Sequence, residues 1–213
     1  MANRKKKDNN RKELILEAAE RVVSKSGIQG ATLRGIADEA GISTGAIYYY
    51  FSSKEEILYA LMDSSLSEST RIAYVARGGL KETDDLLKEI SENVGKRFRK
   101  NADNRVQFYL AQEAIMGDNE LADRFKMKYS EWIGRTEELL GFLYKREKTR
   151  YDTAVASLLI GAIDGVVLQL LMKANPASLN DIIKVYDLLI HEGIPCFLDK
   201  VREMEKKEGI QAE

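Results

Sequence analysis

The sequence has little of the chemistry that most enzymes and disulfide-bonded proteins need. Its 213 residues include one cysteine, Cys196, and one histidine, His191. A single cysteine forms no intrachain disulfide. One cysteine and one histidine are also too few ligands for a zinc site built from these residues. We find no serine–histidine–aspartate set and no glycine-rich phosphate loop. We therefore expect a protein from a reducing compartment that is not an enzyme and has no metal site or cofactor.

Proline is also scarce, with only Pro176 and Pro195, and aromatic residues make up only 8% of the chain. Hydrophobic residues account for 44% and charged residues for 31%. This balance is typical of a helix-rich globular protein with enough length for a sizeable core. The sequence therefore predicts an all-α fold with almost no strand.

A membrane anchor is not expected either. The N-terminus is basic but has no apolar segment behind it, unlike a secretory signal. The run from Ala154 to Met172 is long enough to span a bilayer, but Asp164 and Gln169 interrupt it. A central aspartate costs roughly 2.5 to 3.5 kcal/mol on insertion scales. We expect a cytoplasmic protein whose apolar run lies in a core or an interface.

Charge divides the chain unevenly. Residues 1–54 carry 10 Lys and Arg against 6 Asp and Glu, a balance of +4, whereas residues 55–213 carry 23 against 28, a balance of −5. A basic segment favours contact with a polyanion, and an acidic remainder rich in apolar residues favours self-association or ligand binding. Together with the composition of the N-terminus, the division predicts a basic flexible arm over 1–10, a domain over 11–54 that contacts a polyanion, and a second domain over 55–213 that self-associates or holds a ligand.

Two short helices within the basic part form the clearest motif. Thr32 is a candidate N-cap for "LRGIADEA", Gly41 follows it at the position that favours a left-handed residue, and Ser43 can cap "TGAIYYYF". A three-residue turn led by glycine between two short helices is a helix-turn-helix. A first helix over about 11–27 precedes it, with apolar residues at helical spacing.

Further helices follow to the end of the chain. Ser53 and Glu56 form a capping box for a helix that we expect to run to about Val75, before Gly78-Gly79. The remaining expected helices are 82–100, 104–117, 119–147, 150–173 and 178–207, which makes about nine in all. Gly193 and Pro195 kink or break the last one, and a break would make ten.

The segment from Thr32 to Leu58, "TLRGIADEAGISTGAIYYYFSSKEEIL", closely resembles the DNA-binding region of TetR-type transcriptional regulators. The resemblance implies a two-domain, all-α homodimer that binds a palindromic DNA operator as a repressor. It also implies contacts from the following residues: Thr32, Arg34, Ser43, Thr44, Gly45, Ala46, Tyr48, Tyr49, Tyr50 and Lys54. In that scheme Ser43 caps the recognition helix, Thr44 and Ala46 face base edges, and Lys54 meets a phosphate.

Two positions depart from the family pattern. Thr44 stands where lysine is common, and Tyr50 stands where histidine is frequent. The three consecutive tyrosines lie about 100° apart on a helix, so they cannot all face DNA. Ile47 and Phe51 are expected to pack inward, which leaves Tyr48 and Tyr49 as the better contacts and Tyr50 undecided between DNA and packing.

The second domain is expected to dimerise through helices 153–173 and 178–207, as the resemblance implies, and to hold a small apolar or aromatic effector. Candidate pocket residues are Phe108, Tyr109, Gln112, Glu113, Met116, Tyr129, Trp132 and Asp164. Each of them also has a plain packing explanation, because aromatic residues at helical spacing are what a core needs. For Asp164, structural pairing is the favoured role and ligand contact the other.

Three alternatives remain open at this point. The chain could be an enzyme, it could use the helix-turn-helix to contact protein, or it could bind DNA without sequence preference or without any effector. The basic residues at the N-terminus fit nonspecific phosphate or minor-groove contact as well as a solubilising tail; they are Arg4, Lys5, Lys6, Lys7, Arg11 and Lys12. Binding to a specific palindrome, compared with salt-sensitive binding to any DNA, discriminates between these readings.

Overall fold

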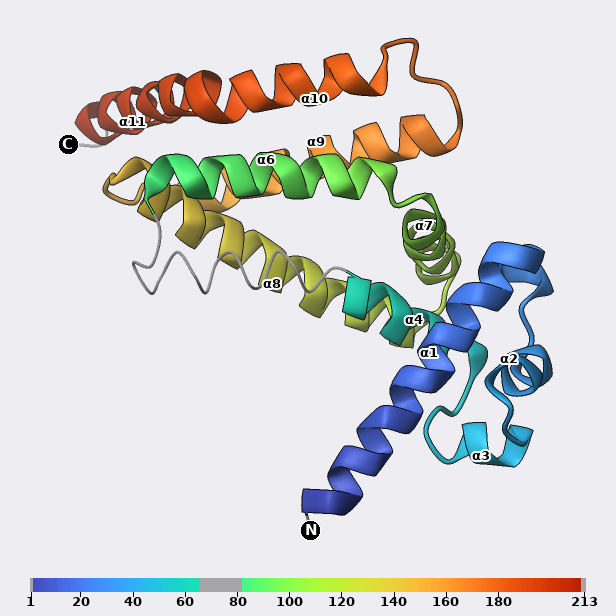
Figure 1. The fold of residues 1–213 in the computed structure, drawn as a ribbon. Helices are drawn as coiled ribbons and strands as arrows, with labels where there is room; N and C mark the ends of the chain where they lie inside the picture. The colour runs from blue at the N-terminus through green and yellow to red at the C-terminus, as the bar shows by residue number, and fades with distance from the viewer. Residues whose placement is uncertain (1, 66–81, 212–213) are drawn as a thin grey trace. The chain divides into compact units, whose positions relative to one another are not determined.

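The computed structural model describes residues 2–65 and 82–211, and within them every regular element is a helix (Figure 1). This confirms the all-α prediction. The elements are α1 (Ala2–Gly30), α2 (Leu33–Ala40), α3 (Thr44–Tyr48), α4 (Lys54–Ser65), α6 (Thr83–Arg99), α7 (Asn101–Ile115), α8 (Asn119–Tyr144), α9 (Asp152–Leu171), α10 (Leu179–Leu188), the π-helix η1 (Leu189–Gly193) and α11 (Ile194–Gln211). The expected end of the fourth helix near Val75 and the glycine pair after it lie outside the described residues.

The first helix begins earlier than predicted. α1 starts at Ala2, so the segment expected as a flexible arm has helical backbone. It contains lysine, arginine and asparagine but no proline or glycine, and lysine and arginine are good helix formers. The predicted end near Gly27 is confirmed, because Gly27 has φ 71° and ψ 173°, outside the helical region. Glycine takes this conformation without a Cβ penalty.

The chain divides into two compact units, of which the first contains α1 to α4, α7 and the start of α8. Its core is formed by buried apolar side chains of these helices, which include Ile15, Ala18, Ala19, Ile36, Ala37, Ile47, Ile57, Leu58, Met62, Val106 and Leu110. α4 packs against α1 and α7, and α7 also contacts α1. The helix-turn-helix therefore folds together with α4 and α7, beyond residue 54, and the predicted domain division stays a prediction.

The second unit contains α6, most of α8, and α9 to α11. Its larger core cluster joins α8, α9, η1 and α11 through Leu140, Val155, Ile190, Ile194, Leu198 and Val201. A smaller cluster of Leu86, Leu87 and Leu143 joins α6 to α8. Only Lys100 separates α6 from α7, so the expected connector at 101–104 is wrong. Asp103 is instead an acidic residue in the first turn of α7, where the helix dipole favours it.

The last predicted helix neither ends nor breaks at Gly193 and Pro195. The chain passes from α10 through the π-helix η1 directly into α11 (Figure 1). Proline has no backbone N–H and its ring crowds the preceding turn, so a regular α-helix cannot continue through it undisturbed. The wider π turn accommodates Pro195, and the Ile194 N–H bonds the carbonyl of Leu189, five residues back.

α9 is the one helix in the described ranges that is long and apolar enough to cross a membrane by length and composition, with a mean hydropathy of 2.1. Val155, Ala156 and Val167 on one side of it are buried, whereas Leu158 and Met172 are 66% and 60% exposed. One side of α9 thus belongs to the core of the second unit, and the other side is apolar and exposed in the part of the chain that the structure describes.

Candidate nucleic-acid interface

The helix-turn-helix begins with a side-chain cap. Thr32 has extended backbone, and its Oγ1 accepts a hydrogen bond of 3.0 Å from the Gly35 N–H. This bond satisfies one of the backbone donors that a helix N-terminus leaves open. The Thr32 hydroxyl keeps its own proton, so an exposed Thr32 can cap α2 and still donate to a phosphate. Arg34, in the first turn of α2, is also exposed.

The turn between the two helices depends on Gly41. Its φ of 65° and ψ of 32° lie in the left-handed region, as the sequence predicts. The next residue closes the helix, because the Ile42 N–H bonds the Ala37 carbonyl at 3.0 Å. These two features form the C-terminal motif in which a left-handed glycine satisfies the last carbonyls of a helix.

Ser43 caps the second helix in the same way as Thr32 caps the first. Its Oγ accepts a hydrogen bond of 3.2 Å from the Ala46 N–H. The first three positions of α3 are Thr44, Gly45 and Ala46, of which Gly45 is exposed and the other two are half-buried. Small side chains at the start of a helix allow its backbone to approach a nucleic-acid groove closely.

α3 is shorter than predicted, because it ends at Tyr48 and not at Phe51. The Tyr50 N–H bonds the Ile47 carbonyl at 2.8 Å, a tighter i to i−3 bond that closes the last turn. The chain must then leave the helix to reach Ser53, whose Oγ accepts a bond of 3.1 Å from the Glu56 N–H at the start of α4. The two closely spaced helix starts leave room for only five residues in α3.

The tyrosine run divides as the helical geometry predicts. Tyr48 is 58% exposed and Tyr49 is 69% exposed, whereas Ile47 and Phe51 are buried. Tyr50 is half-buried, and its ring meets that of Tyr49 edge to face with centroids 4.8 Å apart. Two large aromatic side chains therefore lie on the surface of the motif, held there by an inward-facing isoleucine and phenylalanine.

Buried residues fix α2 to α1 and α3 to α2. Ile36, Ala37 and Ile47 are 0%, 1% and 0% exposed, and α2 packs against both α1 and α3. Replacing either isoleucine with alanine would leave a cavity that costs about 2 to 5 kcal/mol.

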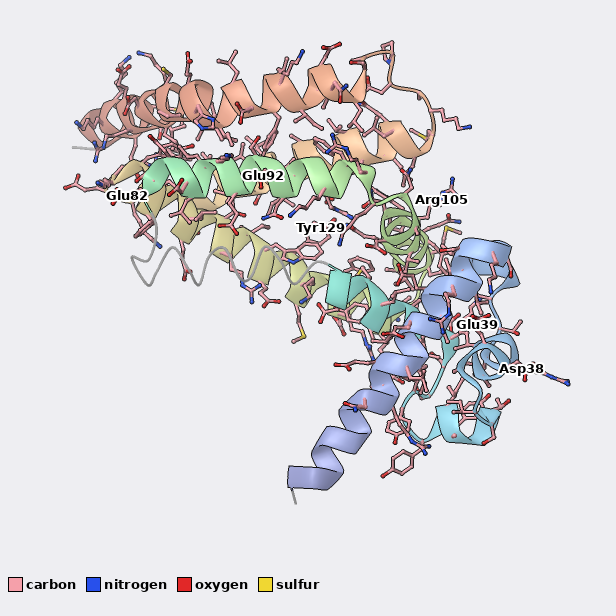
Figure 2. All side chains as sticks on the ribbon, viewed as in Figure 1. Asp38, Glu39, Glu82, Glu92, Arg105 and Tyr129 are labelled. Atoms are coloured by element: carbon pink, nitrogen blue, oxygen red, sulfur yellow. The ribbon has the colours of Figure 1, made fainter. Side chains whose placement is uncertain are left out.

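A pair of cations on α1 also holds α2. Glu39 lies on the side of α2 toward α1, where it accepts 2.9 Å from Lys25 Nζ and 2.7 Å from Arg21 Nε (Figure 2). The bonds from Lys25 and Arg21 lower the pKa of Glu39 below its usual value. Both cations are exposed, so these ion pairs contribute orientation more than stability.

The start of α4 carries the last predicted contact residue. Glu56 is the second residue of the predicted capping box, and its carboxylate accepts from Ser52, with distances of 2.5 Å to Ser52 N and 2.7 Å to Ser52 Oγ. Lys54 is half-buried, and its Nζ lies 5.7 Å above the ring centroid of Tyr109 on α7. A second cation, Lys12 of α1, lies 5.7 Å from the ring centroid of Phe51.

The predicted pocket residues fall into two groups. Five of them lie on α7 or directly after it, in the first unit: Phe108, Tyr109, Gln112, Glu113 and Met116. Gln112 is exposed and Met116 is 77% exposed in this chain. Tyr109 contacts Lys54 of α4. This group is thus closely connected to the helix that follows the tyrosine run.

The other three, Tyr129, Trp132 and Asp164, come together in the second unit. Tyr129 lies on α8 (Figure 2). Its hydroxyl donates a hydrogen bond of 2.6 Å to Asp164 Oδ2 on α9, and its ring meets that of Trp132 with 5.1 Å between centroids. Arg97 Nη2 of α6 lies 3.7 Å from Asp164 Oδ1. Asp164 is therefore paired, the role favoured from sequence, by groups from two other helices.

Sequence reasoning missed Arg97 in this cluster. The only signal for it was the rule that a carboxylate within an apolar helix needs a partner, and that rule does not say which cation supplies it. Among the described residues, no group of three or more His, Cys, Asp or Glu side chains could hold a metal ion.

Comparison with known proteins agrees with this geometry. The model of the family "Bacterial regulatory proteins, tetR family" matches residues 15–61, from α1 into α4. The regulator TtgR of Pseudomonas putida is 50% identical over 50 residues, which cover 24% of this chain and 24% of TtgR. The repressor AcnR of Corynebacterium efficiens is 29% identical over 162 residues, which cover 72% of this chain and 84% of AcnR.

The fold is shared beyond the helix-turn-helix. The structure of FadR from Bacillus halodurans, a fatty acid degradation regulator, superposes with a TM-score of 0.64 over 86% of this chain and 95% of FadR, at 23% identity. The match to TtgR spans about a quarter of each protein, whereas the likeness in fold extends into the second unit. The helix-turn-helix sequence is thus similar to the tetR family of bacterial regulatory proteins over residues 15–61, and the helical architecture is shared with the solved regulator FadR.

Proposed function

We propose that the protein is a sequence-specific DNA-binding transcriptional repressor that binds a palindromic operator as a homodimer and is released by a small apolar effector. The observation that carries the proposal is the exposure of Tyr48 and Tyr49 beside the small residues at the start of a capped helix. Such a helix fits a major groove about 12 Å wide, and tyrosine can lie along its wall and donate to a phosphate.

Dimerisation is supported by the uncovered side of α9. The exposed residues on this helix recur at helical spacing as Ala154, Leu158, Gly161, Ala162, Leu168, Gln169 and Met172. Gly161 and Gly165 have no neighbouring atom within 4 Å of the place where a Cβ would stand. Apolar and small residues along one face permit the close approach of a second helix. A second copy of the chain would cover this stripe.

The end of the chain offers a matching apolar surface. The exposed hydrophobic residues of α10, η1 and α11 are Val185, Leu188, Leu189, Phe197 and Met204. Together with α9 they would supply two helices from each protomer to a four-helix bundle around a twofold axis. A twofold dimer presents two recognition helices, which is the reason for a palindromic operator.

Release by an effector would act through the spacing of those two helices. A ligand that prefers a conformer with the wrong spacing shifts the population away from DNA. The aromatic side chains of Phe125, Tyr129 and Trp132 on α8 suit a small apolar or aromatic molecule, with the Asp164 pair as a polar anchor. A protein with this function acts in the cytoplasm and carries out no reaction.

The test measures binding of the purified protein to duplexes that tile the DNA upstream of its own gene. Fluorescence anisotropy compares these duplexes with scrambled ones at physiological salt. We expect at least about a thousandfold preference for one duplex, with two protomers bound. Equal, salt-sensitive binding to all duplexes would instead identify a nonspecific DNA-binding protein.

Two variants distinguish a contact of the tyrosines with the DNA groove from nonspecific electrostatic attraction to DNA. Tyr48→Ala and Tyr49→Ala remove exposed rings, so we expect unchanged stability and about tenfold weaker operator binding. Met127→Ala is the matched control, because Met127 is 74% exposed on α8, outside the motif. Full operator affinity in both tyrosine variants would contradict the proposed interface.

A further inference from the structure

Lys54 occupies a position that the helix itself disfavours. It is the first residue of α4, where the helix dipole presents partial positive charge, and the two residues that follow it are the acidic Glu55 and Glu56. Acidic residues stabilise this end of a helix, whereas a lysine does not. The presence of lysine at this place therefore needs another explanation than helix stability.

The ring of Tyr109 supplies a partner. Lys54 Nζ lies 5.7 Å from the ring centroid, within the range of a cation–π contact. Tyr109 lies on α7, which packs against α4 and α1 in the first unit. Its neighbours Val106 and Leu110 are 1% and 0% exposed, so α7 is anchored in the same core as the helix-turn-helix. The ring is thus held by the DNA-binding unit.

Two carboxylates, those of Glu113 and Glu55, lie close enough to Tyr109 to act on its hydroxyl. Burial raises the pKa of Tyr109, and the nearby carboxylates of Glu113 and Glu55 raise it further. The phenol therefore stays neutral, and its ring remains a suitable face for an ammonium group. The ammonium group of Lys54 adds a positive charge close to these two carboxylates.

We propose that Tyr109 is a positioning residue for DNA binding, whose ring holds the ammonium group of Lys54 in place to meet a DNA phosphate. The inference rests on the proposed function and assigns Tyr109 to the DNA side of the protein in place of the effector pocket. A free lysine loses much side-chain freedom when it is fixed, and a ring contact made beforehand reduces that loss. The ammonium has three donors, and the ring occupies only one side of it.

The experiment measures binding of the full-length protein to the preferred upstream duplex over a range of salt concentrations. Tyr109→Phe keeps the ring and should bind like the wild type. Tyr109→Leu should bind about two- to fivefold more weakly, the size of one cation–π contact. Lys54→Met should lower the log–log salt slope by about 0.9, the value for one lost phosphate contact, whereas the control Lys88→Met on α6 should not.

A double variant decides between positioning and a general structural role. If Tyr109 acts through Lys54, Tyr109→Leu should cause no further loss in the Lys54→Met background. A loss of equal size in both backgrounds, unchanged binding by Tyr109→Leu, or tighter binding by it would each overturn the inference. A wild type without preference for any upstream duplex would refute the proposed function itself, whereas a wild-type preference together with an unchanged affinity of Tyr109→Leu would remove this inference alone.

Discussion

The hydroxyl of Tyr144, at the end of α8, donates a hydrogen bond of 2.5 Å to the backbone carbonyl of Ile190 in the π-helix. In a π turn this carbonyl would accept from the N–H of the residue five positions later, which is Pro195 and has no N–H. Tyr144 therefore supplies the donor that proline lacks. The bond joins α8 to the segment between α10 and α11.

Replacing Tyr144 with phenylalanine tests this relationship. The ring remains to pack in the core, but the buried Ile190 carbonyl loses its donor, so we expect the free energy of unfolding to fall by about 1 to 3 kcal/mol. Urea denaturation measures the loss. The loss should be smaller in a Pro195→Ala background, where residue 195 regains an N–H. An equally large loss there would show that the Tyr144 hydroxyl does not replace the N–H that Pro195 lacks.

The same residue predicts how stability changes in alkali. Burial raises the pKa of Tyr144 from 10 to about 12, so the folded chain keeps the phenol proton where the unfolded chain loses it. The contribution to stability is therefore complete below pH 10 and is lost as the pH rises towards 12. We expect the free energy of unfolding to fall more steeply in this window for the wild type than for Tyr144→Phe, as measured by urea denaturation at several pH values. Parallel curves of the free energy of unfolding against pH for the two proteins would show that the pKa of Tyr144 is not raised.

A buried carboxylate at the start of α9 predicts the opposite behaviour in acid. Asp152 is 2% exposed, and it accepts from Thr149 Oγ1 at 2.6 Å and Arg146 Nη2 at 2.9 Å. Burial alone would raise the pKa of Asp152, but the bonds from Thr149 and Arg146 outweigh it and hold the pKa below its ordinary 3.8. The contribution of Asp152 to stability is therefore fully present above its ordinary pKa of 3.8, and it is lost as the pH falls through the lower pKa of the folded chain.

Asp152→Asn removes this charge and leaves Arg146 without its buried partner. We expect a loss of about 3 to 5 kcal/mol at neutral pH, as for other broken buried pairs, and a smaller further loss on acidification than in the wild type. Chemical denaturation at neutral and acid pH measures both quantities. Asp199→Asn, at an exposed position on α11, is the control and should change neither.

The cap of the recognition helix predicts a link between stability and DNA binding. Ser43→Ala removes the acceptor for the Ala46 N–H and should cost about 0.5 to 2 kcal/mol. Ser43→Asp keeps an acceptor and should restore most of that stability, while its charge weakens attraction to DNA. Thermal unfolding combined with anisotropy separates the two effects. An alanine variant as stable as the wild type would show that the bond is of no consequence.

The uncovered side of α9 predicts the oligomeric state. Leu158→Glu should convert the proposed dimer to a monomer, because it places a charge in the apolar stripe. Gly161→Leu should do the same without harming the single chain, since a Cβ at this position meets open space. Analytical ultracentrifugation measures the change, and Met127→Glu on α8 is the control. Dimers that persist in both α9 variants would place the interface elsewhere.

The sequence could predict the fold well where local chemistry decides it. The caps at Thr32 and Ser43 and the left-handed Gly41 are short-range features, and each has the predicted conformation. The inward side of the tyrosine run also follows from spacing alone, because Ile47 and Phe51 are four residues apart. These predictions needed no knowledge of the rest of the chain.

Features that depend on contacts distant in sequence could not be predicted. Spacing cannot show that Arg97 would reach Asp164, that Tyr144 would reach Ile190, or that Tyr109 would lie under Lys54, because each pair comes from separate helices. The length of α3 was also wrong, since it depends on how soon the chain must start α4. The predicted DNA contacts and effector contacts remain predictions.

The π turn also changes how the C-terminal segment should be compared with regular helices. Such a turn fits one additional residue into a rotation that an α-helix completes without it. Residues after Gly193 are therefore displaced by about one position in the helical wheel relative to those before Leu189. A heptad pattern traced from Val185 onward loses its phase before Leu198. The length of the 189–193 segment, more than the identity of its side chains, determines which side of α11 faces the core.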